Sequence, residues 1–371
     1  MIKIAFTGDI AFSKYFKNAY EKENLLSKEI IDFLSDSFLT VANVEAPVSA
    51  RPITSIEDLA HVNPLEITET LEKINAKIWN LANNHSMDCG EQGLNDTLEI
   101  AKRKGARTIG AGFNREEARK PLIIEKEDIK IGLLSVASPL SEPATDEKAG
   151  CFMWDEFKLI KKTLLELKNT CDHVVVISHG GEEFTQIPLP FARDKYHKYL
   201  KWGADIVVAH HPHVPQNYER VGNKIIFYSL GNFIFDTDYQ RNQRNTDIGV
   251  LVKIYFEKDK FTFDSLSIKI DREENVVKET SPLLIFRNID AKTYKRLLPL
   301  AEEDYSINLW SKLAFIKKTE KIKNKRVFFK TKMKRFKRYE RWGIIKAMLR
   351  KPFKSYRKCD KELVKYISNS K

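Results

Sequence analysis

The 371-residue sequence has few cysteines and no long hydrophobic run. Its four cysteines, Cys89, Cys151, Cys171 and Cys359, are widely spaced and form no CxxC pair, which excludes a disulfide-rich scaffold and a zinc site built from cysteines. No apolar stretch approaches the length of a membrane span. The N-terminus lacks the charged start, the apolar stretch and the cleavage site of a signal peptide. We therefore expect a cytoplasmic protein with reduced thiols.

The sequence also has no internal repeat and no low-complexity linker, which excludes repeat architectures. A hydrophobic share of 42% is ample for a packed core. Strand patterns alternate with helical patterns up to about residue 290, and from about Thr293 the pattern is helical. We therefore divide the chain into a domain over residues 1–290 and a basic, amphipathic helical extension over residues 291–371.

The net positive charge of the chain comes from its C-terminal part. Residues 317–371 contain 22 Lys and Arg against four Asp and Glu, a net charge of +18; since the whole chain carries +12, residues 1–316 carry −6. A mildly acidic body with a cationic appendage predicts that the appendage has its own electrostatic partner.

An apolar stripe runs through this basic stretch. Large apolar residues recur every three to four positions, at Phe329, Met333, Phe336, Tyr339 and Trp342. Such a composition favours a helix lying on an anionic membrane surface. Two alternatives stay open: a helix packed back on the acidic body, and a nucleic-acid partner, which attracts the same cations and which we rank last.

The most informative stretch of the body is a strand that leads into histidines. Ile206, Val207 and Val208 form the β-branched run of a strand covered on both faces. His211 and His213 follow it with one proline between them, so both imidazoles can face one cation. From this pair alone, the interpretation as two surface histidines without a shared role is equally good.

Four other predicted strands also end on residues that can bind metals. These residues are Asp9, Glu45, Asn84 with His85, and His179. Because unrelated polar residues would scatter over helices and both sheet edges, their recurrence at strand ends predicts one site at one edge. A set of oxygen and nitrogen ligands without thiolate suits Mn²⁺, Fe or Zn²⁺ in a catalytic site.

Six motifs occur along this region in a fixed order. They are Gly8-Asp9, NVEAPV at residues 43–48, LANNHSMDCG at 81–90, SHGGEEF at 178–184, HHPHVPQ at 210–216 and YSLGNF at 228–233. Together they resemble the bacterial CapA family of capsule and poly-γ-glutamate synthesis proteins, whose fold is related to the calcineurin-like metallophosphoesterases. The resemblance covers roughly residues 2–270 and excludes the basic stretch. It implies an α/β sandwich of mixed β-sheets flanked by helices.

The resemblance also implies a set of metal ligands. On the metallophosphoesterase scheme, one ion would have four protein ligands, Glu45, Asn84, His179 and His211. The other would have three, Asp9, Glu45 and His213, with Glu45 in the bridging position. The first motif of that scheme carries a histidine two residues after the aspartate, where this sequence has Ala11. The second position is therefore the weaker one.

Further residues are candidates for catalysis or substrate binding. His85 matches the outer histidine of the scheme, which contacts substrate and can protonate a leaving group. Asp88 is either its partner or the N-cap of the next helix, and we favour the N-cap slightly. Glu183 is a candidate for substrate binding or general base catalysis, against a solvated loop carboxylate. Ser229 and Asn232 form a turn that can present polar groups to an anionic oxygen, against simple turn chemistry.

The remaining histidines have no motif around them. We interpret His61, His173 and His197 as structural or surface residues, and His210 as a residue that forms a hydrogen bond within its loop.

The sequence thus predicts a metal-dependent hydrolase that contains one or two divalent ions, Mn, Fe or Zn. Its substrate would be a phosphoester, or an amide or ester bond, in an anionic capsular polymer or its lipid-linked precursor. The alternative is a non-catalytic capsule-assembly component that uses the fold as a binding module, which the missing histidine at position 11 favours. Residues 317–371 would allow peripheral contact with the inner face of the membrane, and we do not expect nucleic acid as a partner.

Overall fold

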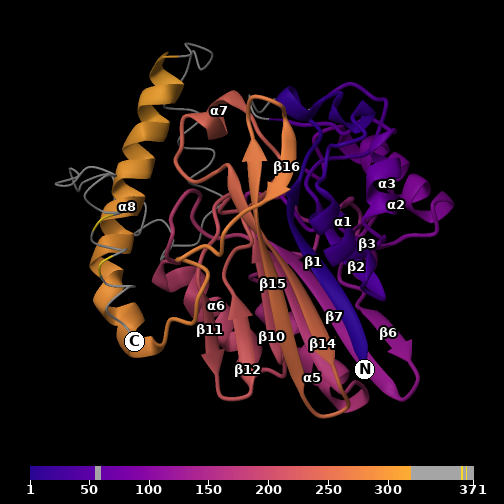
Figure 1. Cartoon of the computed structure of the whole chain (residues 1–371). Coiled ribbons are helices and arrows are strands. Elements are labelled where there is room, and N and C mark those ends of the chain that lie inside the picture. The colour runs from indigo at the N-terminus through magenta and orange to yellow at the C-terminus, as the bar shows by residue number, and fades with distance from the viewer. Residues whose placement is uncertain (55–59, 319–360, 362–364, 366–371) are drawn as a thin grey trace.

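Two β-sheets packed face to face form the centre of the molecule, and helices cover their outer faces (Figure 1). The computed structural model describes residues 1–54, 60–318, 361 and 365. Within them, the arrangement is a four-layer α/β/β/α sandwich. The α/β class expected from the sequence, with mixed sheets flanked by helices, is confirmed.

The first sheet is mixed and has eight strands among the described residues. Its parallel half carries the first motifs of the chain, and its antiparallel half follows the last motif. In spatial order it contains β16 (Val276–Glu279), β15 (Phe261–Asp271), β14 (Ile248–Phe256), β1 (Ile2–Ile10), β2 (Leu39–Val44), β3 (Ala76–Asn80) and β4 (Arg107–Ile109), with β13 (Asn232–Ile234) paired to the end of β1.

The second sheet has a parallel centre with an antiparallel strand at each edge. In spatial order it contains β11 (Tyr218–Val221), β12 (Lys224–Phe227), β10 (Ile206–His210), β9 (His173–His179), β7 (Ile129–Ala137) and β6 (Leu122–Lys126). A separate short pair joins β5 (Ala111–Gly112) to β8 (Gly150–Cys151).

The helices divide between the two outer faces. The first sheet is covered by α1 (Lys28–Ser35), α2 (Ile67–Lys73), α3 (Gly90–Arg103) and the short turns η1 (Lys14–Phe16) and η2 (Ala19–Glu21). The second sheet is covered by α4 (Arg115–Ala118), α5 (Phe157–Thr170) and α6 (Pro190–Lys201). Two further helices, α7 (Asp238–Arg241) and α8 (Ala291–Lys318), follow strands β13 and β16 of the first sheet, and α8 runs along one side of the molecule (Figure 1).

Strand β9 shows why the buried strands have continuous apolar sequences. Val175 and Ile177 pack into the core between the two sheets, whereas Val174 and Val176 pack against the helical layer outside. Because both faces of the strand are covered, every position in it is buried, and the alternation of a half-exposed strand is lost.

Most element positions expected from the sequence are confirmed, with shifts at their ends. Helix α1 begins at Lys28, after the 3₁₀ turn η2, which ends at Glu21, and an isolated bridge at Leu26. Strand β1 continues through Asp9 to Ile10, since β13 pairs with its end. The proposed boundary at residue 290 coincides with the start of α8, while the basic stretch after Lys318 lies outside the described residues except for two isolated positions. No helix in the described part of the chain is both long and apolar enough to cross a membrane.

The junction between β1 and β13 requires a residue without a side chain. The Asp9 amide donates a hydrogen bond of 2.9 Å to the Gly231 carbonyl. A Cβ atom at Gly8 would lie 2.2 Å from that same oxygen, so the strands could not approach. Gly8 therefore fixes the position of Asp9.

We expect Gly8→Ala to destabilise the fold by about 2–3 kcal/mol, because the added methyl group clashes with backbone that cannot rotate away. Gly222→Ala is the matched control: its methyl group meets no atom within 4 Å, so only the strain of its φ of +63° remains, about 1 kcal/mol. Urea unfolding of both variants measures the difference. Equal stability of the two proteins would contradict the packing argument.

Candidate metal centre

The structure brings the six predicted ligands together at the carboxyl edge of both sheets. From the first sheet come Asp9 at the end of β1, Glu45 directly after β2 and Asn84 four residues after β3; from the second come His179, the last residue of β9, with His211 and His213 directly after β10. The convergence predicted from the strand ends is therefore observed. Whether these side chains bind a metal stays a prediction.

Two overlapping groups in this cluster have the spacing of a metal site. In each group one ligand atom per residue lies within 4.8 Å of the others, and all the residues are buried. The first group is Glu45, His179 and His211, and the second is Asp9, Glu45 and His213. Glu45 belongs to both groups, and its predicted bridging role stays a prediction.

The first group also includes an amide oxygen. His179 Nε2 lies 2.7 Å from Asn84 Oδ1 and 3.4 Å from Glu45 Oε1. These residues lie at or after the ends of three strands; Glu45 and His179 are fully buried, and Asn84 is partly buried. With His211, they make a four-residue set of two nitrogens and two oxygens, which suits Mn²⁺, Fe²⁺ or Zn²⁺.

The second group is held by hydrogen bonds around Asp9. Its Oδ1 accepts a bond of 2.8 Å from the Asn43 amide, and its Oδ2 lies 3.1 Å from His213 Nδ1. His213 Nδ1 also lies 3.1 Å from Asn232 Oδ1. Because two oxygen acceptors face Nδ1, that nitrogen carries the proton, which leaves the lone pair of Nε2 for a cation.

The buried Glu45 carboxyl group has oxygens without hydrogen bonds. Among the described residues, neither oxygen of Glu45 has a hydrogen-bond partner, although its side chain is fully buried. Buried oxygens of this kind are costly unless a cation or a proton satisfies them. The donor set therefore fits a divalent metal.

The pKa values of the two carboxyl groups diverge. Burial and the charge of Asp9 raise the pKa of Glu45 well above its ordinary value. Burial also acts to raise the pKa of Asp9, but contacts with His210 and His213 outweigh it and hold that pKa well below the usual range. Burial, aided by His211, lowers the pKa of His179, so its imidazole is neutral. A neutral imidazole is the form that binds a metal.

The backbone at the histidine pair is strained. His211 has a φ of +94° and His213 a φ of +57°, values that residues other than glycine rarely adopt. The left-handed residues turn both imidazoles toward the carboxylates. Strain of this kind, of order 1–3 kcal/mol per residue, is typical of functional sites.

Behind Asp9 lies a polar chain that sequence reasoning did not identify. Asn80 donates a 2.7 Å bond to Asn43 Oδ1, and Ser135 of the second sheet donates to Asn80 Oδ1. Asn43 is then oriented with its amide group toward Asp9. The sequence signal that could have identified this network is a polar residue inside an apolar strand, which indicates a buried hydrogen bond.

Asp88 is the partner of His85, and the N-cap interpretation is wrong. His85 Nδ1 lies 2.7 Å from Asp88 Oδ2, and both side chains are buried. Helix α3 begins at Gly90 with Cys89 as its N-cap residue and no side-chain cap. Since Asp88 holds Nδ1, Nε2 is the nitrogen of His85 that can hold or transfer a proton.

Glu183 lies at the border of the cluster, in the loop between β9 and α6. Its Oε1 is 4.0 Å from His211 Nε2, and its Oε2 accepts a 3.5 Å hydrogen bond from the Tyr239 hydroxyl. The neighbouring Phe184 stacks on His213 with ring centroids 5.9 Å apart. This loop therefore forms one wall of the site, and Glu183 is partly open to solvent.

The two residues predicted to bind substrate are engaged within the protein. Ser229 Oγ accepts a hydrogen bond from the Gly231 amide, which is turn chemistry. Asn232 contacts His213 through Oδ1, and its Nδ2 donates to Gln240 and to the Thr246 carbonyl. Asn232 thus orients a candidate ligand, and substrate binding by either residue stays a prediction.

Two further histidines lie beside the cluster. His210 ends strand β10, and its Nδ1 is 3.5 Å from Asp9 Oδ1, so it acts on a candidate ligand and not only within a loop. His61 is buried against His85 with ring centroids 4.6 Å apart. His173 and His197 lie elsewhere, the first at the opposite end of β9 and the second against Glu219.

Helix α8 supports the loop that carries Glu183. Asn308 donates a 2.8 Å hydrogen bond to the Phe184 carbonyl, and Asp304 accepts one of 3.2 Å from the Gln186 amide. Asp304 also pairs with Arg244. Nothing in the sequence linked this helix to the site, because its apolar positions only indicate that it packs on the body.

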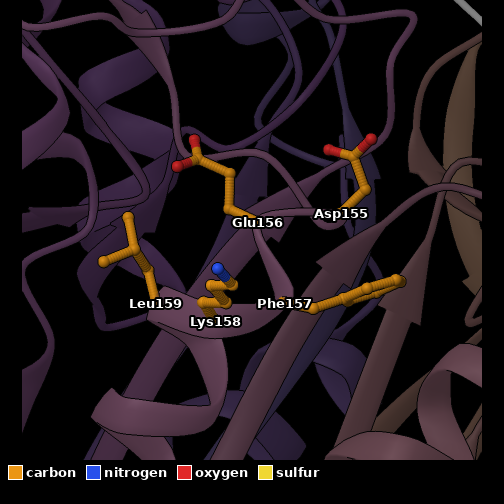
Figure 2. A pocket seen from close by; sticks show the side chains of 5 residues that line it. All are labelled: Asp155, Glu156, Phe157, Lys158 and Leu159. Carbon is orange, nitrogen blue, oxygen red and sulfur yellow. The ribbon is translucent and has the colours of Figure 1, made fainter.

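A surface pocket lies apart from this cluster. It is lined by five consecutive residues at the start of α5, Asp155, Glu156, Phe157, Lys158 and Leu159 (Figure 2). Among the described residues, none of the candidate metal ligands lines it, and its lining residues come from one chain segment.

The fold and the cluster define a class of protein: an α/β sandwich with a buried histidine and carboxylate centre suited to divalent cations. The sequence matches the family described as "Bacterial capsule synthesis protein PGA_cap" over residues 3–237. The chain belongs to this family.

Curated relatives carry capsule-related names. The chain is 29% identical over 268 residues to "PGA biosynthesis protein CapA" of Bacillus subtilis, which covers 70% of this chain and 69% of that protein. It is 28% identical over 253 residues to "Capsule biosynthesis protein CapA" of Bacillus anthracis, covering 65% of this chain and 62% of that protein. The match thus spans less than two thirds of the second relative.

Solved structures are similar to this one at a distance. A hypothetical protein from Thermus thermophilus gives a TM-score of 0.48 at 14% identity, covering 72% of this chain and 99% of that chain. The 5'-nucleotidase from Candida albicans gives a TM-score of 0.42 at 9% identity, covering 82% of this chain and 59% of that chain.

We expect Asn308→Ala to loosen the loop over residues 181–189, because it leaves the buried Phe184 carbonyl without its donor, at a cost of about 1–3 kcal/mol. Amide hydrogen exchange measures the change as faster exchange in that loop. Lys295→Ala, an exposed change on the same helix, is the control and is expected to leave the exchange unaltered. Unchanged protection in Asn308→Ala would show that α8 does not support the loop.

Proposed function

We propose that this protein is a metal-dependent hydrolase that acts in the synthesis of capsule, poly-γ-glutamate or a related surface polymer. The observation that carries the proposal is the pair of overlapping ligand groups joined by Glu45, whose buried oxygens have no hydrogen-bond partner among the described residues. Membership of the capsule synthesis family supports the biological role.

The ligand count favours one strongly bound ion. The first group, Glu45 with His179 and His211, has Asn84 as a fourth member, whereas the second group has three residues and shares one of them. Ala11 offers no nitrogen to the second group and packs in a small apolar cluster with Ala46 and Phe235. We therefore propose one divalent ion, Mn, Fe or Zn, with a second held more weakly.

The other side chains have separate tasks. A divalent ion bound there would supply Lewis acidity and lower the pKa of water. His85, held through Nδ1 by Asp88, would donate a proton from Nε2 to the leaving group. Glu183, at the open border of the site, would bind the substrate or accept a proton. The buried network behind Asp9 would hold the Asp9 carboxylate in place.

The proposed substrate is an anionic polymer or its lipid-linked precursor, cleaved at a phosphoester, or at an amide or ester bond. The names of the two CapA relatives support the polymer class. The residues after Lys318 would provide contact with a membrane surface, a prediction that falls outside the described residues.

A second function has one observation in its favour. With Ala11 in place of a histidine, the second ligand group has His213 as its one nitrogen donor among the described residues, so a binding module that assembles capsule components without hydrolysis would need no more than the fold. In that case Asn84→Ala and His211→Ala would still support capsule production in a strain lacking the wild-type protein. The hydrolase predicts loss of capsule in both variants at normal protein levels.

We expect purified protein incubated with Mn²⁺, Fe²⁺ or Zn²⁺ to retain at least about one metal equivalent per chain after gel filtration. His211→Ala should lower the affinity about 10–100-fold or more, because it removes one of four ligands of the better-supplied group. His197→Ala, which lies outside the cluster, is the control. Plasma emission spectroscopy measures the metal content, and wild-type protein that retains none of the three metals would refute the proposal.

A further inference from the structure

His61 is a buried histidine of the site region that the proposed function leaves without a task. It lies in the segment before α2, has 5% of its surface exposed and belongs to no motif. Burying a polar imidazole ring costs free energy unless other contacts compensate, so its position in the protein has to be explained.

The residue is anchored at its backbone and at its ring. Its amide donates a 2.6 Å hydrogen bond to Asp88 Oδ2, the same oxygen that lies 2.7 Å from His85 Nδ1. Its ring Nδ1 lies 3.0 Å from Ser13 Oγ. One carboxylate oxygen thus fixes both histidines relative to each other, and the serine sets the rotation of the second ring.

The ring faces the reactive side of the site. Its centroid is 4.6 Å from that of His85 and 5.1 Å from that of Phe235, and Phe235 lies 5.3 Å from His213. His61 therefore stands between the candidate acid and the second ligand group. Position 11, directly after strand β1, is an alanine, and a segment distant in sequence places a histidine beside the site.

Metal binding is not the best explanation of this position. In the described part of the chain, the groups with metal-site spacing do not include His61. Burial, together with the charges of His85 and His213, lowers the pKa of His61, so its ring is neutral. Ser13 Oγ occupies Nδ1, and where its hydroxyl donates, the proton of the neutral ring is on Nε2; we assign this tautomer, in which Nε2 is a hydrogen-bond donor.

We propose that His61 is a substrate-binding residue whose Nε2 donates a hydrogen bond to an anionic oxygen of the substrate, beside the proton donor His85. This inference rests on the proposed function. The ligand class is an oxyanion, either a phosphoryl group or a carboxylate, which share the acceptor geometry. Asp88 then has two roles: it orients His85 through the ring and positions His61 through the backbone.

The test is calorimetric titration of the Mn²⁺-loaded full chain with inorganic phosphate, and in a second arm with γ-glutamylglutamate as a source of carboxylate. His61→Phe keeps the ring contacts but removes the donor, and we expect it to weaken binding of one of these probes about tenfold or more. His61→Gln keeps an N–H donor and should weaken it less. The probe that responds identifies the source of the oxyanion.

Metal content and melting temperature are measured beside each titration. His173→Phe is the matched control, since His173 is also buried but lies at the far end of β9. Unchanged affinity for both probes in a folded, Mn²⁺-loaded His61→Phe protein overturns the inference and leaves the proposed function standing. Loss of a Mn²⁺ equivalent in that variant also overturns it, because His61 would then be a ligand. Wild-type protein that takes up no Mn²⁺, Fe²⁺ or Zn²⁺ refutes the hydrolase itself.

Discussion

The arrangement of this site depends on burying two carboxylates, Asp9 and Glu45, next to each other. Both are fully buried, and in a medium of low dielectric two negative charges at this distance cannot both be stable without compensation. The opposite pKa directions of the two groups express this constraint: the histidine contacts favour the charged form of Asp9, while burial beside Asp9 favours the protonated form of Glu45. A divalent cation would relieve both at once, and for that reason the cluster is better explained as a metal site than as a structural ion-pair network.

The two sheets supply different chemical groups to the site. The first sheet supplies the oxygens, through the ends of β1, β2 and β3, whereas the second supplies the imidazoles, through β9 and β10. The cluster therefore forms only when the sandwich is closed, since neither sheet holds both charge types. The chain of hydrogen bonds from Ser135 through Asn80 and Asn43 to Asp9 crosses from one sheet to the other and fixes their registration next to the site.

The sequence was informative where a local pattern determines a position in space. Parallel strands end at a common edge, so the location of Asp9, Glu45 and His179 follows from recognising their strands. Asp88 was misread because an acidic residue before a helix usually acts as a cap, and only the tertiary structure shows that its carboxylate contacts His85. His61 could not be placed at all, since its position depends on the path of a loop between β2 and α2 that no periodicity describes.

Helix α8 illustrates the same limit and adds a functional argument. The family match ends at residue 237, yet Asp304 and Asn308, far beyond it, bind the backbone of the loop that carries Glu183 and Phe184. In that loop Glu183 is partly exposed, whereas His211 is buried, and a loop at the border of a site is a segment whose geometry its neighbours can alter. The ligand positions are set by the sandwich, which belongs to the family, whereas the shape of the open wall is set in part by a helix that lies outside the family match. Substitutions in this helix are therefore expected to change the shape of the open wall and to leave the buried charge balance of Asp9 and Glu45 intact.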